Sequence, residues 1–341
     1  MAHITFSEGS GLQDSIFGKS QAPIRRFIEK RAEAFESDAT YKKLFDINPS
    51  NRFAEKVTSM TDMGEFQAVG ENGAYPVTGM QEGYSKTFEH VTWKNSFSIS
   101  REIMDDAVLM DLRKKPDAFI TGYYRTREMY GAALLGTALM DCRAPGTAAT
   151  DVSFGGVKHS LLGMDGQRLF SKTHPCKVKG AAQSNAYAGA FSEANLGKLE
   201  TLMENAYDDD GNLLNLSPDT IVIPNDYATK QAVFAVLGSD KVTGSGNNDF
   251  NYLFGRWNVI VWPYLNKYVA GSTAVPWLLV DSNFNKQIGT LMWFDRVALE
   301  VNSDIDKNTD ANVWRGYSRF TAGFADWHGA FAGGVNNGTS F

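Results

Sequence analysis

Residues 168–175 contain side chains of the types used in nucleophilic catalysis. His174 stands near Ser171 and Cys176, and a histidine beside a hydroxyl or a thiol forms the usual pair of base and nucleophile. Such a pair also needs an acidic group that orients the imidazole, and the sequence places none. Because Pro175 holds the residue before it in an extended or turn conformation, this segment is more typical of a structural loop. We therefore predict no catalytic site here.

Two acidic runs resemble calcium-binding loops. In the run DIDKN, Asp304 and Asp306 occupy alternate ligand positions, but Thr309 stands where the loop requires glycine and Arg315 where it requires a bidentate glutamate. In the run DDDGN, residues 208–212, the glycine comes at the fourth place, which is typical of a turn that ends a helix. We predict turns at both places.

Other motifs of enzymes and metal sites are missing from the sequence. It contains no GxxxxGK[ST] phosphate loop, no GxGxxG after a predicted strand, no GxSxG elbow and no HExxH pair. The five histidines and the two cysteines, Cys142 and Cys176, show no metal-ligand spacing. We expect no catalytic residue, no metal and no cofactor. An enzyme whose active site is dispersed along the chain stays open as an alternative.

The charge of the chain is unevenly distributed. The net charge is −6, yet residues 19–43 carry seven basic and four acidic side chains and are therefore basic, at +3. This segment is expected either to touch an acidic partner, such as a second copy of the chain, or to form a solvated helix face. No stretch reaches the ~18 consecutive apolar residues of a membrane span, so we expect no membrane contact.

Residues 48–100, which lie between two predicted helices, carry too few apolar side chains to form a hydrophobic core of their own. A short amphipathic helix is predicted from Pro23 and is expected to lie on the surface. Residues 48–100 are rich in glycine and turns and end in a strand of period two around Trp93. A long helix is predicted over 116–142. Since a two-stranded ribbon is marginal alone, we expect a neighbouring copy to cover residues 48–100.

The second half of the chain alternates between helix and strand. Ser192 and Asn225 are predicted to cap two helices, and 220–224, 259–262 and 277–281 read as strands. Further strands are predicted at 291–294, 297–301 and 313–320. The fold class expected from these elements is α+β, with an α/β module of about one hundred residues.

Five segments in this order resemble the major capsid proteins of tailed bacteriophages, which have the Hong Kong 97 type of fold, and among them the Mu-like major head subunits. These segments are 92–106, 169–175, 210–224, 251–265 and 314–331. Each is weak alone, but together they extend over nearly the whole chain.

The resemblance implies a division of the chain into capsid domains. Residues 1–47 would form an N-terminal arm and 48–100 an extended β-hairpin loop that lies over a neighbour. A peripheral domain would comprise 101–145 and 288–322 with the spine helix 116–142, and an axial domain 146–287 and 323–341. Inter-subunit contacts are then expected at seven residues of the arm and loop, namely Arg25, Arg26, Phe27, Phe66, Tyr75, Tyr84 and Trp93.

The function implied by the resemblance is that of a major capsid, or head, protein. Such a chain would be made in the bacterial host cytoplasm and would assemble with itself, as hexamers and pentamers, into an icosahedral virion shell enclosing double-stranded DNA without reading its sequence. No fused scaffolding segment is expected, whereas a separate scaffold, a portal and decoration proteins are possible partners. The alternatives are an encapsulin-like nanocompartment shell and, less favoured, the dispersed-site enzyme.

Overall fold

A computed structural model of the chain describes residues 5–7, 28, 30–36, 38–60, 66–77, 79, 82–106, 114–141, 150–178, 180–241, 250–269 and 274–335. The chain forms two compact units, each assembled from separate stretches of sequence. Unit 1 comprises Met1–Glu55, Phe88–Gly131 and Trp293–Ala322, and unit 2 comprises Lys56–Thr87, Ala132–Met292 and Gly323–Phe341. The assignment to peripheral and axial domains stays a prediction.

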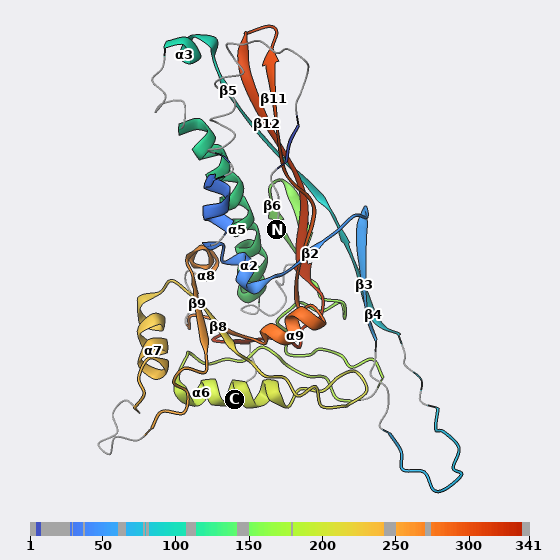
Figure 1. Ribbon diagram of the computed structural model, residues 1–341. Coiled ribbons are helices and arrows are strands. Elements are labelled where there is room, and N and C mark those ends of the chain that lie inside the picture. The colour runs from blue at the N-terminus through green and yellow to red at the C-terminus, as the bar shows by residue number, and fades with distance from the viewer. Residues whose placement is uncertain are drawn as a thin grey trace. The chain divides into compact units, whose positions relative to one another are not determined.

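Unit 1 is organised around a five-stranded sheet. Its order is β1 (Thr5–Ser7), β11 (Leu291–Asp306), β12 (Ala311–Phe324) and β5 (Val91–Ile99), with β2 (Asp46–Pro49) also paired to β11. The strands β5 and β12 are antiparallel, and Trp93 pairs with Ser318. The strand around Trp93 that the sequence predicts is therefore a member of this sheet, as Figure 1 shows.

The long helix α5 (Lys114–Asp141) begins slightly before the predicted start at residue 116. Its Phe119, Ile120 and Tyr124 belong to the buried core of unit 1 together with residues of the sheet. Ile28 and Ala32 are also part of this core. The described residues of the helix after Pro23 lie on the surface of unit 1 as expected, with Lys30, Arg31 and Glu33 exposed, but its apolar face also contributes to the core, which the sequence did not predict.

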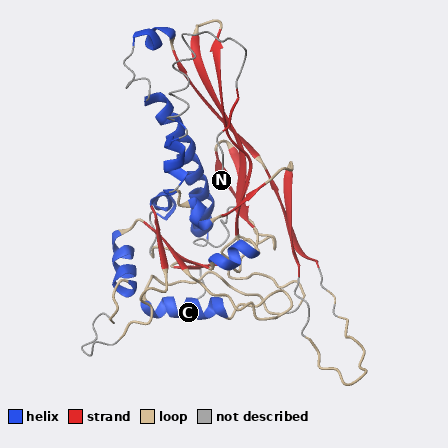
Figure 2. Cartoon of the chain, in the orientation of Figure 1, coloured by secondary structure: helices blue, strands red, loops and turns tan. Residues whose placement is uncertain are grey.

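Unit 2 contains a four-stranded sheet of order β13 (Ala330–Gly333), β10 (Trp277–Val280), β8 (Thr220–Pro224) and β9 (Asn258–Trp262). β8 and β9 are parallel, and β10 is antiparallel to both β8 and β13. All residues of β8 and β10 are buried, as expected of central strands with both faces covered. The helices shown in Figure 2 include α6 (Glu193–Glu204), α7 (Tyr227–Leu237) and α9 (Ser282–Gln287).

Capping side chains begin these helices. Ser192 accepts a hydrogen bond from the Asn195 N–H and caps α6, as predicted. The N-cap of α7 is Asp226, which accepts from the Thr229 N–H, and not the predicted Asn225. An aspartate suits this position better because its charge also favours the helix N-terminus. The shorter elements are α2 (Tyr41–Leu44), α3 (Arg101–Asp106), α8 (Asn266–Val269) and the 3-10 turn η1 (Pro263–Leu265).

Two small ribbons complete the described fold. The strands β6 (Asp151–Phe154) and β7 (Val157–Ser160) form a tight hairpin. The strands β3 (Ala54–Met60) and β4 (Glu82–Glu89) form a second two-stranded ribbon. Both acidic runs form turns: Asp208 accepts from the Asn212 N–H, and Asp306 accepts from the Asn308 N–H at the β11–β12 connection. The predictions of turns at these places are confirmed.

Candidate assembly surface

The segment that connects β3 and β4 carries large apolar side chains in solvent. Among its described residues, 66–77 have no regular secondary structure, and all of them are exposed. Phe66 is 107% exposed, Tyr75 94% and Val77 96%. Figure 2 shows this loop extending beyond the paired ends of the two strands. Exposed aromatic and aliphatic side chains grouped in this way are typical of surfaces that bind a partner.

Backbone and lysine contacts hold the base of this hairpin. Ser59 Oγ accepts a hydrogen bond from the Tyr84 N–H at 2.9 Å. Lys86 Nζ donates to Leu162 O and to Phe324 O, the second at 2.9 Å. Burial lowers the pKa of Lys86 to about 8. Lys177 Nζ donates to Glu82 O at 2.8 Å and lies over the Tyr84 ring. The apolar loop therefore starts from an anchored ribbon.

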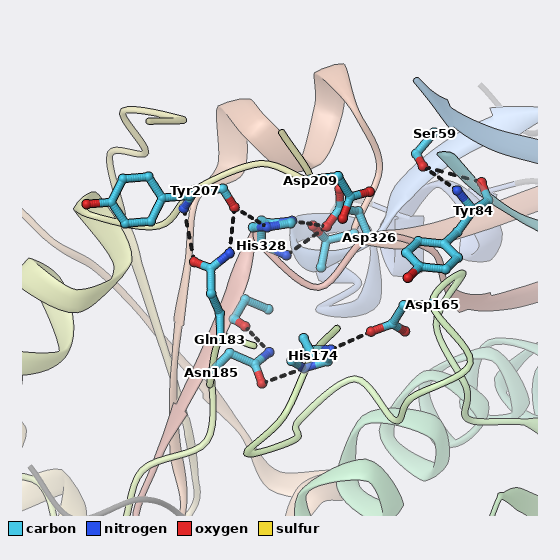
Figure 3. A network of polar contacts seen from close by, with 12 residues as sticks. Ser59, Tyr84, Asp165, His174, Gln183, Asn185, Tyr207, Asp209, Asp326 and His328 are labelled. Atoms are coloured by element: carbon cyan, nitrogen blue, oxygen red, sulfur yellow. Dashed lines mark hydrogen bonds and ion pairs between the residues drawn. The ribbon is translucent and has the colours of Figure 1, made fainter. Parts of the chain in front are cut away.

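Two histidines beside the hairpin base are each paired with an aspartate (Figure 3). His174 Nδ1 lies 2.6 Å from Asp165 Oδ2, and His328 Nδ1 lies 2.5 Å from Asp326 Oδ1. The Trp327 ring is stacked on both imidazoles, with centroids 4.3 Å from His174 and 3.8 Å from His328. The three rings are thus stacked, and each imidazole is also paired with a carboxylate.

The remaining ring nitrogens are also occupied. His174 Nε2 is 3.0 Å from Asn185 Oδ1, and the Asn185 amide donates to Leu169 O and Ala330 O, which fixes its orientation. His328 Nε2 donates to Tyr207 O at 2.9 Å. Neither imidazole thus keeps a nitrogen to activate a nucleophile, and His174 is only 1% exposed. This arrangement is typical of a structural network.

The charges of the His328–Asp326 pair stabilise each other. Burial opposes the charged form of His328, but the Asp326 carboxylate and the hydrogen bonds outweigh it and raise the pKa of the imidazole above its usual value. Burial likewise opposes the Asp326 carboxylate, and His328 nevertheless lowers its pKa. Asp209 lies close by, and burial raises its pKa. Both shifts have the direction expected when the charged forms of the imidazole and the carboxylate stabilise each other.

A cavity of about 330 Å³ lies within unit 2 between this network and the ribbon. Its lining includes Tyr84 from β4, Asp209, Asp326 and Trp327. Within the described part of the chain, no three His, Cys, Asp or Glu side chains are placed to hold one metal ion. In the same part of the chain, no helix is both long and apolar enough to cross a membrane.

The structure separates the seven predicted contact residues into three groups. Arg25, Arg26 and Phe27 lie outside the described residues. Phe66 and Tyr75 are fully open to solvent. Tyr84 and Trp93 are half-buried within the chain, where Trp93 stacks on Phe320 at 5.1 Å and donates to Phe320 O. Contacts of these residues with another subunit stay a prediction.

Sequence reasoning missed the polar network around Trp327. In this network the carboxylate that pairs with His174 belongs to Asp165. Asp165 lies in an irregular segment, and its distance from His174 along the sequence matches no known motif. The pair of His328 and Asp326 was the one available signal, because the run DWH places an acid and an imidazole two residues apart. That spacing is too common to predict a buried ion pair.

Comparisons with known proteins identify the family. The family model described as phage capsid protein matches residues 83–333. No curated protein matches the sequence. A chain in the solved structure titled Mycobacterium phage Patience is 13% identical and superposes with a TM-score of 0.51 over 98% of this chain and 92% of that one. This similarity shows a shared fold.

Two further solved structures are similar at lower scores. A chain of Mycobacterium phage Adephagia is 16% identical, with a TM-score of 0.47 over 89% of this chain and 90% of that one. A chain of the capsid of an empty GTA particle is 13% identical, with a TM-score of 0.49 over 86% and 89%. Because the family model covers most of the chain, the α+β fold described above is the phage capsid fold, and the protein belongs to the phage capsid protein family.

Proposed function

We propose that the chain assembles with copies of itself, as hexamers and pentamers, into an icosahedral shell that encloses double-stranded DNA. The observation that carries this proposal is the exposed apolar loop 66–77 on an anchored ribbon. Exposed aromatic side chains of this kind gain free energy only when another surface covers them. In a repeated assembly, the covering surface is a second copy, and each such contact recurs under closed symmetry.

The finer assignments belong to the same proposal. The loop would lie over a neighbouring subunit through Phe66, Tyr75 and adjacent residues, the N-terminal arm would contribute Arg25 and Arg26, and units 1 and 2 would correspond to peripheral and axial domains. The chain would have no enzymatic activity, would be made in the host cytoplasm, and would belong to the Mu-like subgroup. A separate scaffold, a portal and decoration proteins would be its further partners. An encapsulin-like shell is not favoured by the family match.

Electron microscopy of the purified full chain tests the proposal. We expect closed or partly closed shells across a range of salt concentrations and crowding agents, since the weak contacts of many subunits add. Monodisperse small oligomers under every condition would contradict a self-assembling shell subunit. Shells that take up protein cargo and exclude DNA during expression would instead support a nanocompartment.

A further inference from the structure

Two arginines on neighbouring strands of the unit 1 sheet form no ion pair with any acidic residue that the structure describes. Arg319 of β12 pairs across the ladder with Thr92 of β5. Arg296 lies on β11 next to Val297, whose carbonyl accepts a hydrogen bond from Ser318 Oγ at 3.0 Å. This bond brings Arg296 and Arg319 together where β11 and β12 run side by side. Like charges placed so close across a sheet destabilise it unless an anion lies between them.

A buried histidine lies beside the same two arginines. His90 directly precedes β5 and stands two residues before Thr92, the partner of Arg319 in the ladder. His90 Nε2 is 2.8 Å from Ser50 Oγ, and the Ser50 N–H donates to Asp295 O, directly before Arg296. His90 is 8% exposed. Burial and then the charges of Arg296 and Arg319 lower the pKa of His90, and the carboxylates of Glu55 and Asp295 oppose this shift.

Each of these three side chains has a buried nitrogen with no hydrogen-bond partner. The atoms are His90 Nδ1, Arg296 Nη1 and Arg319 Nε. Buried donors without acceptors are rare in folded proteins and costly, above all when the donor is charged. Both arginine side chains are only half-buried, so this cluster also opens to solvent.

The carboxylates around the cluster are engaged elsewhere. Asp295 binds Arg127 Nη2 through both oxygens, at 2.8 and 2.6 Å. Glu55 accepts a hydrogen bond from Ser50 Oγ at 2.7 Å. Among the residues that the structure describes, no carboxylate forms an ion pair with Arg296 or Arg319. The two guanidinium groups thus have carboxylates in their surroundings but no carboxylate in direct contact among the described residues.

We propose that Arg296, Arg319 and His90 form a binding site for an oxyanion of the phosphate class. Guanidinium groups bind phosphate oxygens through paired, charge-assisted hydrogen bonds. A phosphate presents enough oxygens to accept from two guanidinium groups and an imidazole N–H at once, which a carboxylate with two oxygens does less well. The occupant is either free inorganic phosphate or a phosphodiester group of nucleic acid. The inference does not depend on the formation of a shell.

Calorimetric titration of the purified full chain with inorganic phosphate tests this site. The wild-type chain is compared with R319Q, R296Q and the control R315Q. Arg315 has the same charge and lies on the same strand and face as Arg319, but it is exposed and already paired with Asp304 at 3.8 Å. We expect the wild-type chain and R315Q to bind alike. R319Q and R296Q should bind at least about tenfold more weakly, since charge-assisted hydrogen bonds are lost.

A second measurement separates ligand binding from a structural role. In buffer without phosphate, R319Q should unfold at the same denaturant concentration as the wild-type chain or at a higher one, because like-charge repulsion is removed. Lower stability of R319Q without phosphate would overturn the proposal, since the guanidinium would then have a partner within the fold. Equal phosphate binding by R315Q and R319Q would also overturn it and would indicate an adventitious ion only.

Competition with a short single-stranded DNA oligonucleotide distinguishes the two sources of phosphate. If the occupant is a phosphodiester, the oligonucleotide binds more tightly than inorganic phosphate, and R319Q weakens it. If the occupant is free phosphate, the oligonucleotide does not displace it. A further outcome would also overturn the proposal: the wild-type chain binds no phosphate, and R319Q forms no shells. This result would indicate that a carboxylate of a second copy binds Arg319.

Discussion

Arg127 of α5 is almost fully buried, although its guanidinium is charged. Its side chain is 2% exposed, and its guanidinium binds both oxygens of Asp295. The rings of Tyr41, Trp293 and Phe320 each lie 5.0 Å from the guanidinium carbon. Cation–π contacts with several rings and a bidentate carboxylate together replace the water that burial removes. This residue therefore holds α5 to the sheet of unit 1 by charge as well as by packing.

Replacing Arg127 by methionine should lower the free energy of unfolding by about 3 kcal/mol, because a buried carboxylate is left without its counter-charge. Denaturant titration followed by circular dichroism measures this loss. The control is R31M, which breaks the exposed pair of Arg31 and Asp117 and should cost no more than about 1 kcal/mol. Equal stability of the two variants would show that Asp295 is solvated without Arg127.

The ion pair of His328 and Asp326 predicts a dependence of stability on pH. The pKa of His328 is raised in the folded chain, so its contribution is fully present below the unfolded value of 6.5 and is lost as pH rises through the folded value. The pKa of Asp326 is lowered, so its contribution is present above the unfolded value of 3.8 and is lost as pH falls through the folded value.

The difference in unfolding free energy between the wild-type chain and H328Q should therefore shrink as pH is raised from about 6 to about 9. Urea denaturation at several pH values in this interval measures it. H159Q is the control, because burial lowers the pKa of His159, so the difference for this variant should grow and not shrink as pH rises. A difference for H328Q that stays constant with pH would exclude the ion pair.

The elements show what periodicity can predict and what it cannot. The spacing of Phe119, Tyr123 and Tyr130 predicted α5 almost to its ends, because the helical repeat of apolar residues can be recognised within the segment itself. The pairing of β5 with β12 joins residues more than two hundred positions apart, and no local pattern specifies that partner. For the same reason, the sequence could predict that Ser192 begins a helix but not that Asp165 would meet His174.

Two glycines test the contact of α5 with the sheet. A Cβ on Gly316 of β12 would collide with the Phe119 ring and contact Leu299, so G316A should destabilise the chain by about 1–3 kcal/mol through overpacking. Gly122 of α5 has open space around its missing Cβ, so G122A should stabilise the helix by up to about 1 kcal/mol. Thermal unfolding of G316A and G122A measures both changes in stability. Destabilisation by G122A would place another surface against this side of the helix.

At the scale of the whole molecule, the described residues of the β3–β4 loop add no side chain to the hydrophobic core of the subunit. The described loop residues 66–77 are exposed throughout, whereas the ribbon beneath them is fixed by Lys86 and Lys177. The sequence predicted an external cover for residues 48–100, but β5 of this segment pairs with β12 of the same chain, and a cover for the exposed loop 66–77 stays a prediction. The sequence could not predict the anchors, which are carbonyl groups of distant segments.

The triple variant F66S, Y75S and V77S should therefore fold with unchanged stability and fail to form closed shells. Its unfolding free energy should lie within about 0.5 kcal/mol of the wild-type value, since exposed side chains contribute little to the fold. Electron microscopy and denaturation of the same preparation measure both effects. E71Q is the control in the same loop, because it removes charge but no apolar area. Normal shells from the triple variant would contradict a role of this loop in assembly.

The stack of Trp327 between two imidazoles gives the subunit an optical property. Because both imidazoles are stacked on the Trp327 ring, we expect them to quench its fluorescence, so that Trp327 should contribute little to the emission of the folded chain, although it is one of seven tryptophans. Separation of the rings would release this emission. Trp327 also lines the cavity beside Tyr84 of the hairpin base. A conformational change at that base should therefore alter the tryptophan fluorescence of the wild-type chain but not that of the control variant W327F.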